Sequence, residues 1–232
     1  EGGEISFAPE LTSGGPTTIT LTSGSLMVAK GATILGPGAS LLHINSNNET
    51  RGLTINSGIT ATISGLSILN GNAGSGGGIY NSGTLTVSEC ILTANQMNAI
   101  SNQWNGVLTV VKSTLSGNSS TGEGGGIQNS GSITVTNSTI TGNTAATNGG
   151  GIHNDPNARA YLANNTIVGN SAATGGGIHN AGILTFTNSI VANSVSGGDC
   201  MNSGAMGTNI NNLVEDGSCS AQFTGDPLLG AL

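Results

Sequence analysis

Two histidines and one aspartate are the residues whose types and spacing could hold a metal ion. His153 and His179 occupy the same position of a repeated motif, Ile-His-Asn, and Asp155 follows His153 by two residues. If copies of the motif stack, the two imidazoles lie one layer apart on the outside with the carboxylate close by, a set that could bind zinc or nickel. Other copies carry different residues at this position: Tyr80, Ser101 and Gln128. Because the spacing is that of the repeat itself, we expect a solvated column of side chains, with no metal and no other cofactor.

The other charged residues form no pattern that would support catalysis. The acidic residues of the central region fall at different positions of the repeat, so no pair of carboxylates for acid–base chemistry is expected. These residues are Glu89, Glu123, Asp155 and Asp199. No nucleophilic triad or phosphate-binding loop emerges either. We therefore predict that the protein is not an enzyme and has no catalytic residues.

The single tryptophan is a candidate for binding. Trp104 lies in an insertion of the repeat at residues 103–105, and a second insertion covers residues 155–158. An exposed tryptophan offers a platform for a sugar ring or a protein partner, because its large apolar face also carries a polar N–H. The alternative is that Trp104 folds back over the neighbouring layer as packing.

The three cysteines divide into a pair and a single thiol. Cys200 and Cys219 lie together in a C-terminal segment whose repeat is broken, and a disulfide between them would fasten that segment in an oxidising compartment. Cys90 stands where other copies have a small polar residue such as Ser113 or Ser138. We expect it to be a free thiol on a strand.

A repeat of about 25 residues must position all of these side chains. Its clearest copy is residues 124–143, GGGIQNSGSITVTNSTITGN, which holds three short runs of alternating apolar residues between turns rich in glycine and asparagine. The isoleucine after the glycines recurs as Ile79, Ile100, Ile127, Ile152 and Ile178. Three strands per period without a helical run predict an all-β protein, a single parallel β-helix whose rungs stack as a solenoid.

Asparagines recur at two corners of the predicted rungs. One column follows the isoleucine by two residues: Asn81, Asn102, Asn129, Asn154 and Asn180. The other closes the third strand: Asn72, Asn95, Asn118, Asn143, Asn170 and Asn193. Asparagine tolerates the left-handed backbone of a sharp corner, and its amide can bond to the equivalent amide of the next rung about 4.8 Å away. We interpret both columns as structural ladders.

Composition indicates one elongated domain outside the cell. The chain has 232 residues, a net charge of -7 and four Lys or Arg residues, which disfavours nucleic acid as a partner. No apolar run is long enough for a membrane span, and a first residue other than Met suggests either a removed secretion signal or a chain that has been shortened. We expect an N-terminal cap at 1–16, rungs at 17–196, and an irregular C-terminal coil and cap at 197–232.

The repeat, written GGGIxNxGxLTVTNSTIxGN, resembles that of secreted bacterial right-handed β-helix proteins of the choice-of-anchor type. More distantly, it is similar to the repeats of chlamydial polymorphic outer-membrane proteins. The closing segment, with Gly197-Gly198-Asp199-Cys200, Gly217-Ser218-Cys219 and Asp226-Pro227-Leu228-Leu229-Gly230, is similar to the usual ending of such domains. The resemblance implies export, a right-handed coil, and a surface or adhesive role, and it assigns no catalytic residues.

The expected function follows from the ends of such a rod. The first and last rungs expose unpaired backbone groups, and because the two ends differ, contact between them does not close and propagates into a fibre. We therefore expect an extracellular structural subunit that stacks head to tail with its own copies. The residues expected at the contacts are Ile5 and Phe7 at the front, and Phe223, Leu228 and Leu229 at the back. The alternatives are a monomeric adhesin that binds surface glycans or proteins, a polysaccharide-binding β-helix and, with less support, a polysaccharide lyase.

Overall fold

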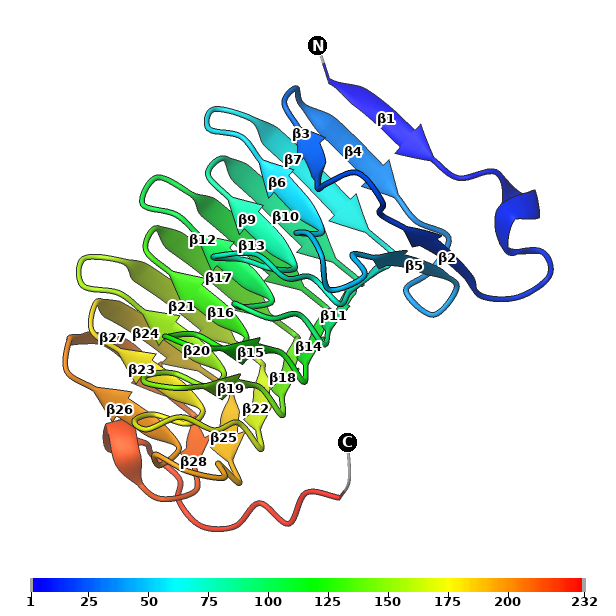
Figure 1. Cartoon of the computed structure of the whole chain (residues 1–232). Helices are drawn as coiled ribbons and strands as arrows, with labels where there is room; N and C mark the ends of the chain where they lie inside the picture. The colour runs from blue at the N-terminus through cyan, green and yellow to red at the C-terminus, as the bar shows by residue number, and fades with distance from the viewer. Residues whose placement is uncertain (1, 231–232) are drawn as a thin grey trace.

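The protein is a rod of stacked β-rungs. The computed structural model describes residues 2–230, with the first rungs at one end of the rod and the C-terminal segment at the other (Figure 1). Every pairing within the three long sheets is parallel, and each complete rung contributes one strand to each of these sheets before the chain enters the next rung. The prediction of an all-β parallel β-helix with rungs of about 25 residues is confirmed, and the described residues contain no α-helix.

Three parallel sheets run the length of the rod. Sheet A contains β1 (Gly3–Ser6), β4 (Ala32–Leu35), β7 (Thr60–Ser64), β10 (Thr84–Ser88), β13 (Val107–Val111), β17 (Ser132–Thr136), β21 (Arg159–Ala163), β24 (Ile183–Thr187) and β27 (Ala205–Ile210). Sheet B contains β2 (Thr17–Thr20), β5 (Leu42–Asn45), β8 (Ser67–Leu69), β11 (Ile91–Thr93), β14 (Thr114–Ser116), β18 (Thr139–Thr141), β22 (Thr166–Val168), β25 (Ile190–Ala192) and β28 (Leu213–Val214). Sheet C contains β3 (Leu26–Val28), β6 (Leu53–Ile55), β9 (Ile79–Asn81), β12 (Ile100–Asn102), β16 (Ile127–Asn129), β20 (Ile152–Asn154), β23 (Ile178–Asn180) and β26 (Cys200–Asn202).

Smaller elements lie at a corner and at the ends. β15 (Ser119–Ser120) and β19 (Thr144–Ala145) pair in parallel at the corner between sheets B and C. Two short 3-10 helices, η1 (Pro9–Thr12) and η2 (Ser218–Ser220), lie near the two ends of the rod. The segment expected as an N-terminal cap therefore contributes β1 to sheet A, in register with β4.

The apolar core fills the bore because side chains alternate along each strand. In β17, Ile133 and Val135 are buried while Ser132, Thr134 and Thr136 are partly exposed. The repeated isoleucine of sheet C is fully buried in each regular rung: Ile79, Ile100, Ile127, Ile152 and Ile178. Burying each such side chain stabilises the fold by about 1.5–3 kcal/mol.

The first asparagine ladder joins sheet C to sheet A. The Asn81 Nδ2 atom donates to Asn102 Oδ1 at 2.7 Å, and the same bond recurs at 2.6–2.8 Å along the ladder. Its members are Asn81, Asn102, Asn129, Asn154, Asn180 and, one rung beyond the prediction, Asn202. Amides in contact along the rod satisfy buried polar groups that the corner would otherwise leave unpaired.

The second ladder is shorter than predicted. It contains Asn95, Asn118, Asn143 and Asn170, whose side-chain amides are joined by hydrogen bonds of 2.8–3.0 Å. Asn72 and Asn193 were wrongly assigned to it. The register of sheet B places Gly71 and Ser194 at the ladder position, while Asn193 is exposed and has a positive φ of 55°. The error is one residue at each corner. Asn193 occupies the left-handed position that precedes the ladder position, which asparagine also favours, whereas Asn72 follows the ladder position.

A third polar column, which the sequence reasoning missed, joins sheet A to sheet B. At each of these corners a residue with positive φ precedes a buried residue, and from Ser113 onward the side chain of the buried residue accepts a hydrogen bond from the backbone N–H of its equivalent in the rung before. The buried residues are Cys90, Ser113, Ser138, Asn165, Ser189 and Asn212. The backbone N–H groups of Cys90 and Ser113, for example, donate to the Oγ atoms of Ser113 and Ser138 at 3.1 and 3.2 Å. Cys90 therefore lies in a corner and not on a strand.

Candidate functional site

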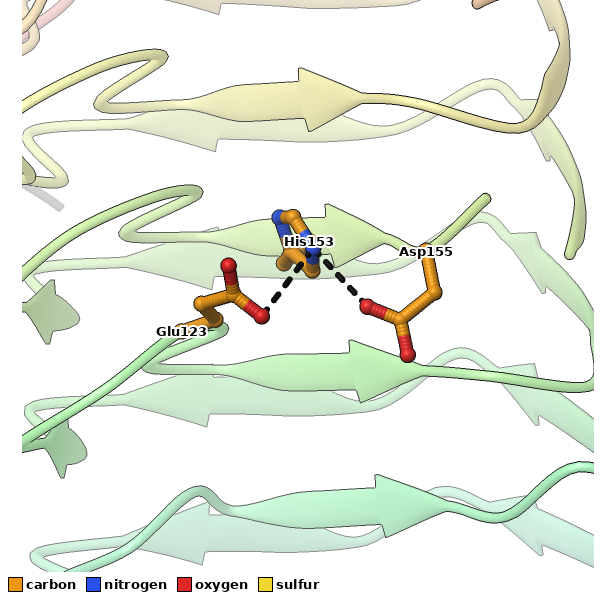
Figure 2. A group of neighbouring side chains, drawn as sticks. All are labelled: Glu123, His153 and Asp155. Atoms are coloured by element: carbon orange, nitrogen blue, oxygen red, sulfur yellow. Dashed lines mark ion pairs between the residues drawn. The ribbon is translucent and has the colours of Figure 1, made fainter.

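The cluster around His153 is the candidate site with the most defined geometry. The register of sheet C aligns Gln128, His153 and His179 on neighbouring strands β16, β20 and β23. Asp155 directly follows β20, and Glu123 lies in the corner that leads into β16. Figure 2 shows Glu123 and Asp155 approaching His153 from two sides.

Both carboxylates converge on one imidazole nitrogen. The His153 Nε2 atom lies 2.9 Å from Asp155 Oδ1 and 3.3 Å from Glu123 Oε2. The His153 side chain is only 4% exposed, whereas those of Glu123 and Asp155 are 39% and 21% exposed. The expectation of a solvated column outside the rod is therefore wrong for His153, which is buried beneath its two acidic partners.

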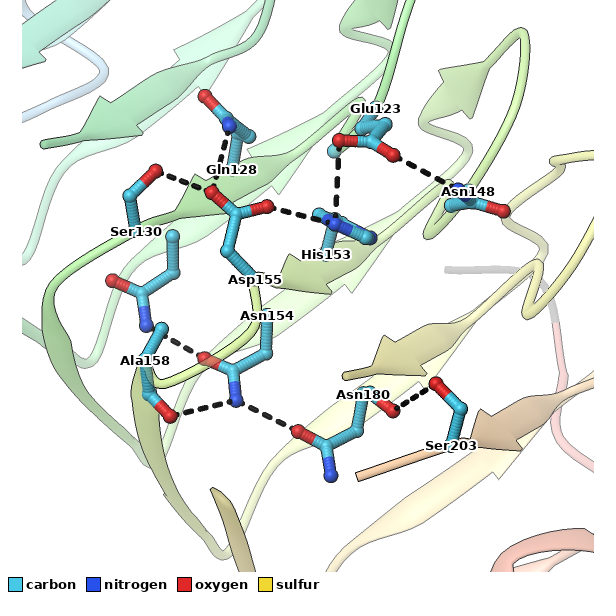
Figure 3. Close-up of polar contacts among 12 residues, drawn as sticks. Glu123, Gln128, Ser130, Asn148, His153, Asn154, Asp155, Ala158, Asn180 and Ser203 are labelled. Atoms are coloured by element: carbon cyan, nitrogen blue, oxygen red, sulfur yellow. Dashed lines mark hydrogen bonds and ion pairs between the residues drawn. The ribbon is translucent and has the colours of Figure 1, made fainter. Parts of the chain in front are cut away.

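Neighbouring side chains hold both carboxylates in place. Asp155 Oδ2 accepts hydrogen bonds from Ser130 Oγ and, at 3.2 Å, from Gln128 Nε2. Glu123 Oε1 accepts one from Asn148 Nδ2 at 2.9 Å (Figure 3). One oxygen of each carboxylate is thus fixed by a neutral donor, and the other oxygen is directed at His153.

His179 contributes by stacking and not by coordination. Its ring lies 4.9 Å from the ring of His153, with the two planes 22° apart, so the expected one-rung stacking is present. Burial, followed by the charge of His153, lowers the pKa of His179 below its usual value, although Glu123 opposes the change. His179 therefore remains largely neutral at neutral pH.

The pKa of Asp155 reflects two opposing effects. Burial alone would raise it, but hydrogen bonds from His153, Ser130 and Gln128, together with the charge of His153, lower the pKa below the usual value of 3.8. Asp155 is therefore a carboxylate at neutral pH, so it can accept a hydrogen bond from His153 or bind a cation together with His153. Because His153 is nearly inaccessible, this arrangement suits the holding of a small ion better than proton transfer to a polymeric substrate.

Glu123 was missed because sequence reasoning compared only residues at equal repeat positions. Glu123 and Asp155 do occupy different columns, but these columns lie on the two sides of His153, and the carboxylates come together there. The inference that the acids are scattered is wrong for this pair. The sequence does place Glu123 directly before a glycine triplet. Because glycines let the corners of successive rungs pack closely, an acidic residue at this point could have been expected to approach the next rung. A Cβ at Gly125 would lie 2.5 Å from the backbone oxygens of Gly150 and Thr144.

A second candidate site surrounds Trp104, whose side chain is 67% exposed. The connections from sheet C to sheet A cover residues 103–106 and 155–158, whereas the connection between them in the stack covers only residues 130–131. Two long loops thus flank a short one and leave a groove of about 240 Å³. Trp104, Ser130, Asn157 and Arg159 are among its lining residues.

The end residues singled out in the sequence lie at opposite ends of the rod. Ile5 and Phe7 line an apolar cavity at the front. At the back, Phe223 is 51% and Leu228 is 85% exposed, while Leu229 is partly buried. The structure leaves these groups far apart within one chain, so any contact between them joins two copies.

The structure joins Cys200 and Cys219 in a disulfide, the pairing that the sequence indicated. It fastens η2 to β26 at the last rung. Cys90 is a free, buried thiol, and burial, only partly offset by hydrogen bonds with the backbone, raises its pKa to about 11. It is therefore protonated and unreactive at neutral pH.

Comparison of the chain with protein-family models, with curated proteins and with solved structures gave no match. Residues 2–230 include no helix of the length and apolar character that a membrane crossing requires.

Proposed function

We propose that the protein is a non-enzymatic, extracellular structural β-solenoid that assembles end to end. The observation that carries the proposal is the open apolar cavity at the front of the rod, with a volume of about 240 Å³. Its lining is entirely apolar: Ile5, Phe7, Ile19, Leu26, Ile34, Ile44, Leu53 and Leu66. An exposed apolar concavity of this kind favours contact with a complementary apolar group.

The front also offers free backbone groups. β1, β2 and β3 are the first strands of sheets A, B and C, so their outer edges have no neighbour among the described residues. Ile5 and Met27 on these edges are 49% and 65% exposed. Unpaired edges flanking an apolar cavity support docking of another chain by both strand pairing and burial.

The back of a second copy supplies a matching projection. Phe223 pairs through its backbone with Leu213 and Val214, which covers the last strand of sheet B and leaves its side chain exposed. Leu228 projects from the following segment. We infer that these two side chains enter the front cavity of the next copy, a heterologous contact that extends into a filament.

Charge at the two ends opposes this contact and makes it dependent on salt. Glu4 and Glu10 are exposed at the front, and Asp216 and Asp226 are exposed at the back. Like charges within about 10 Å repel at low ionic strength and are screened as salt is added. Assembly should therefore strengthen with ionic strength.

Sedimentation velocity and electron microscopy of the purified chain at low and ~0.5 M salt test the proposal. Filaments with an axial repeat of about 40 Å, the length of nine rungs, are expected at high salt. Leu228→Asp should abolish them, whereas Val195→Asp, at a side chain 76% exposed on a corner of the rod, should not. A monomer under all conditions, or equal loss in both variants, would refute end-to-end assembly.

The extracellular location is part of this proposal. A disulfide persists in oxidising compartments, so the Cys200–Cys219 bond supports export. The resemblance of the repeat to secreted β-helix proteins supports the same location.

The groove beside Trp104 favours a second function, the binding of a polysaccharide. Its two walls lie two rungs apart, about 9.6 Å between backbones, which leaves room for one sugar ring with a face against the indole. Arg159 adds a positive charge and Asn157 an amide at the same groove. Stacking with charge pairing suits a sugar that carries a carboxylate.

The single tryptophan makes this function simple to test. Titration with pectin or alginate oligosaccharides should change the intrinsic fluorescence, and Arg159→Gln should weaken binding of the acidic sugars selectively. Neutral oligosaccharides of equal length serve as the control. Unchanged fluorescence with every sugar, or release of unsaturated products in an ultraviolet lyase assay, would contradict a purely binding role.

A further inference from the structure

The convergence of Glu123 and Asp155 on His153 leaves excess negative charge at a nearly buried nitrogen. If His153 is neutral, the three side chains together carry two negative charges. Within the described residues neither carboxylate has a Lys or Arg partner within 4.0 Å. A doubly charged cation would balance this charge fully, whereas protonation of His153 balances only half of it.

The positions of the three ligand atoms fit a metal ion. One nitrogen and two carboxylate oxygens lie within 4.8 Å of one another. Bonds of about 2.0–2.2 Å from Zn²⁺ place neighbouring tetrahedral ligands about 3.3–3.5 Å apart. The distance of 3.3 Å from Nε2 to Glu123 Oε2 already fits, and the distance of 2.9 Å to Asp155 Oδ1 must widen slightly.

We propose that Glu123, His153 and Asp155 bind one divalent transition-metal ion, with Zn²⁺ as the best match. One imidazole and two carboxylates suit zinc and other borderline metals, because calcium requires six or more oxygen ligands. Three protein ligands leave a fourth position for water. The partial exposure of Glu123 and Asp155 gives that position access to solvent.

The supporting residues act on the carboxylates and not on the imidazole. Ser130, Gln128 and Asn148 fix the second oxygen of each acid, as outer hydrogen bonds do at protein metal sites. His153 Nδ1, in contrast, is buried without a hydrogen-bond partner. Because a metal on Nε2 requires the proton on Nδ1, the missing acceptor should weaken binding by about 10–100-fold relative to a fully supported site.

The ion would join two successive rungs. Glu123 leads into β16, whereas His153 and Asp155 belong to the rung of β20. Coordination would thus cross-link the corner before one strand to the face of the next. Since an ion that binds only the folded state stabilises it, metal should raise the melting temperature.

The test uses tag-free protein that has been treated with chelator and dialysed. Addition of Co²⁺ should give visible d–d absorption that saturates at one equivalent, and Zn²⁺ should remove it. Calorimetry with Zn²⁺ should give the same stoichiometry, and differential scanning calorimetry should show a higher melting temperature with metal.

Variants locate the ion. Glu123→Gln, at a partly exposed position, should fold and weaken Zn²⁺ binding by at least tenfold, and His153→Ala should remove the Co²⁺ spectrum. Glu89→Gln is the matched control, because Glu89 is an exposed acid whose only ion pair within residues 2–230 is with Lys112, and it should leave binding unchanged. Absence of one-equivalent binding in the parent protein would overturn the proposal. Equal binding in Glu123→Gln and the parent would overturn it as well, by placing the ion elsewhere.

Discussion

Removal of one ladder amide should destabilise the rod far more than removal of an exposed amide. Asn143 is fully buried. Its Oδ1 atom accepts bonds from the backbone N–H and the Nδ2 atom of Asn118, at 3.0 and 2.8 Å. Its Nδ2 atom donates to Leu115 O and to Asn170 Oδ1, both at 3.0 Å. Asn143→Ala removes all four bonds.

The cost depends on which partners have a substitute. Asn118 Nδ2 still donates to Leu92 O, and Asn170 Oδ1 still accepts from the backbone of residue 143. The buried N–H of Asn118 loses its only side-chain acceptor, and an unpaired buried group costs about 1–3 kcal/mol. With about 1 kcal/mol more for the other lost bonds, we expect a loss of ~2–4 kcal/mol in the free energy of unfolding.

Urea denaturation followed by circular dichroism measures this loss. Asn105→Ala is the matched control, because Asn105 is exposed in the loop beside Trp104, and its midpoint should change little. Midpoints that fall equally in both variants would refute the reasoning that the ladder stabilises the corner. A change in slope for Asn143→Ala alone would mean that the rungs near residue 143 unfold separately, as repeat arrays can.

Three further predictions concern the cysteines and the acidic C-terminal corner. Reduction of the Cys200–Cys219 bond, which closes a loop with a sequence separation of 19, should lower the free energy of unfolding by about 3 kcal/mol. Thermal melting with and without reductant checks this, and in Cys200→Ser the reductant should no longer change the melting temperature. Cys90, with its pKa raised to about 11, should resist Ellman's reagent at pH 8 and react as one thiol after unfolding without reductant; rapid reaction of the native protein would contradict its burial. Burial would raise the pKa of Asp216, but hydrogen bonds from Ser218 and from the backbone lower it below 3.8. The ionised Asp216 carboxylate therefore stabilises the fold at neutral pH, and this stabilisation is lost as the pH falls through the pKa that Asp216 has in the folded state. Asp216→Asn should therefore melt lower than the parent at pH 7, with a gap that closes toward pH 3; a constant gap would argue against this linkage.

The exposure of Trp104 and the groove beside it were only partly predictable from the sequence. The sequence predicts that Trp104 lies in an insertion, because residues 103–105 interrupt the repeat. It does not predict a groove, since that depends on two long loops flanking a short one in the stack. Exposure of Trp104 is likewise a property of the folded loop, whose residues pack beside those of the next rung.

The repeat by itself determined the architecture of this protein. Alternating apolar residues, a period of about 25 and turns rich in glycine and asparagine leave a parallel solenoid as the arrangement that buries one face of every strand. Equal positions in successive rungs then stack, so the Asn81 ladder and the contact of His153 with His179 follow from spacing alone.

Only the tertiary structure decided what lies between columns. The path of each corner, set by backbone angles at single residues, placed Gly71 and Ser194 at the ladder position instead of Asn72 and Asn193, so the second ladder is shorter than the repeat predicts. The same paths brought Glu123 and Asp155 to opposite sides of His153 and buried its ring. The period of the sequence fixes the distance between equivalent residues along the rod. Distances between residues at different positions of the repeat depend instead on how each corner folds. The candidate metal site is of the second kind, because Glu123 and Asp155 both lie in corners on either side of His153.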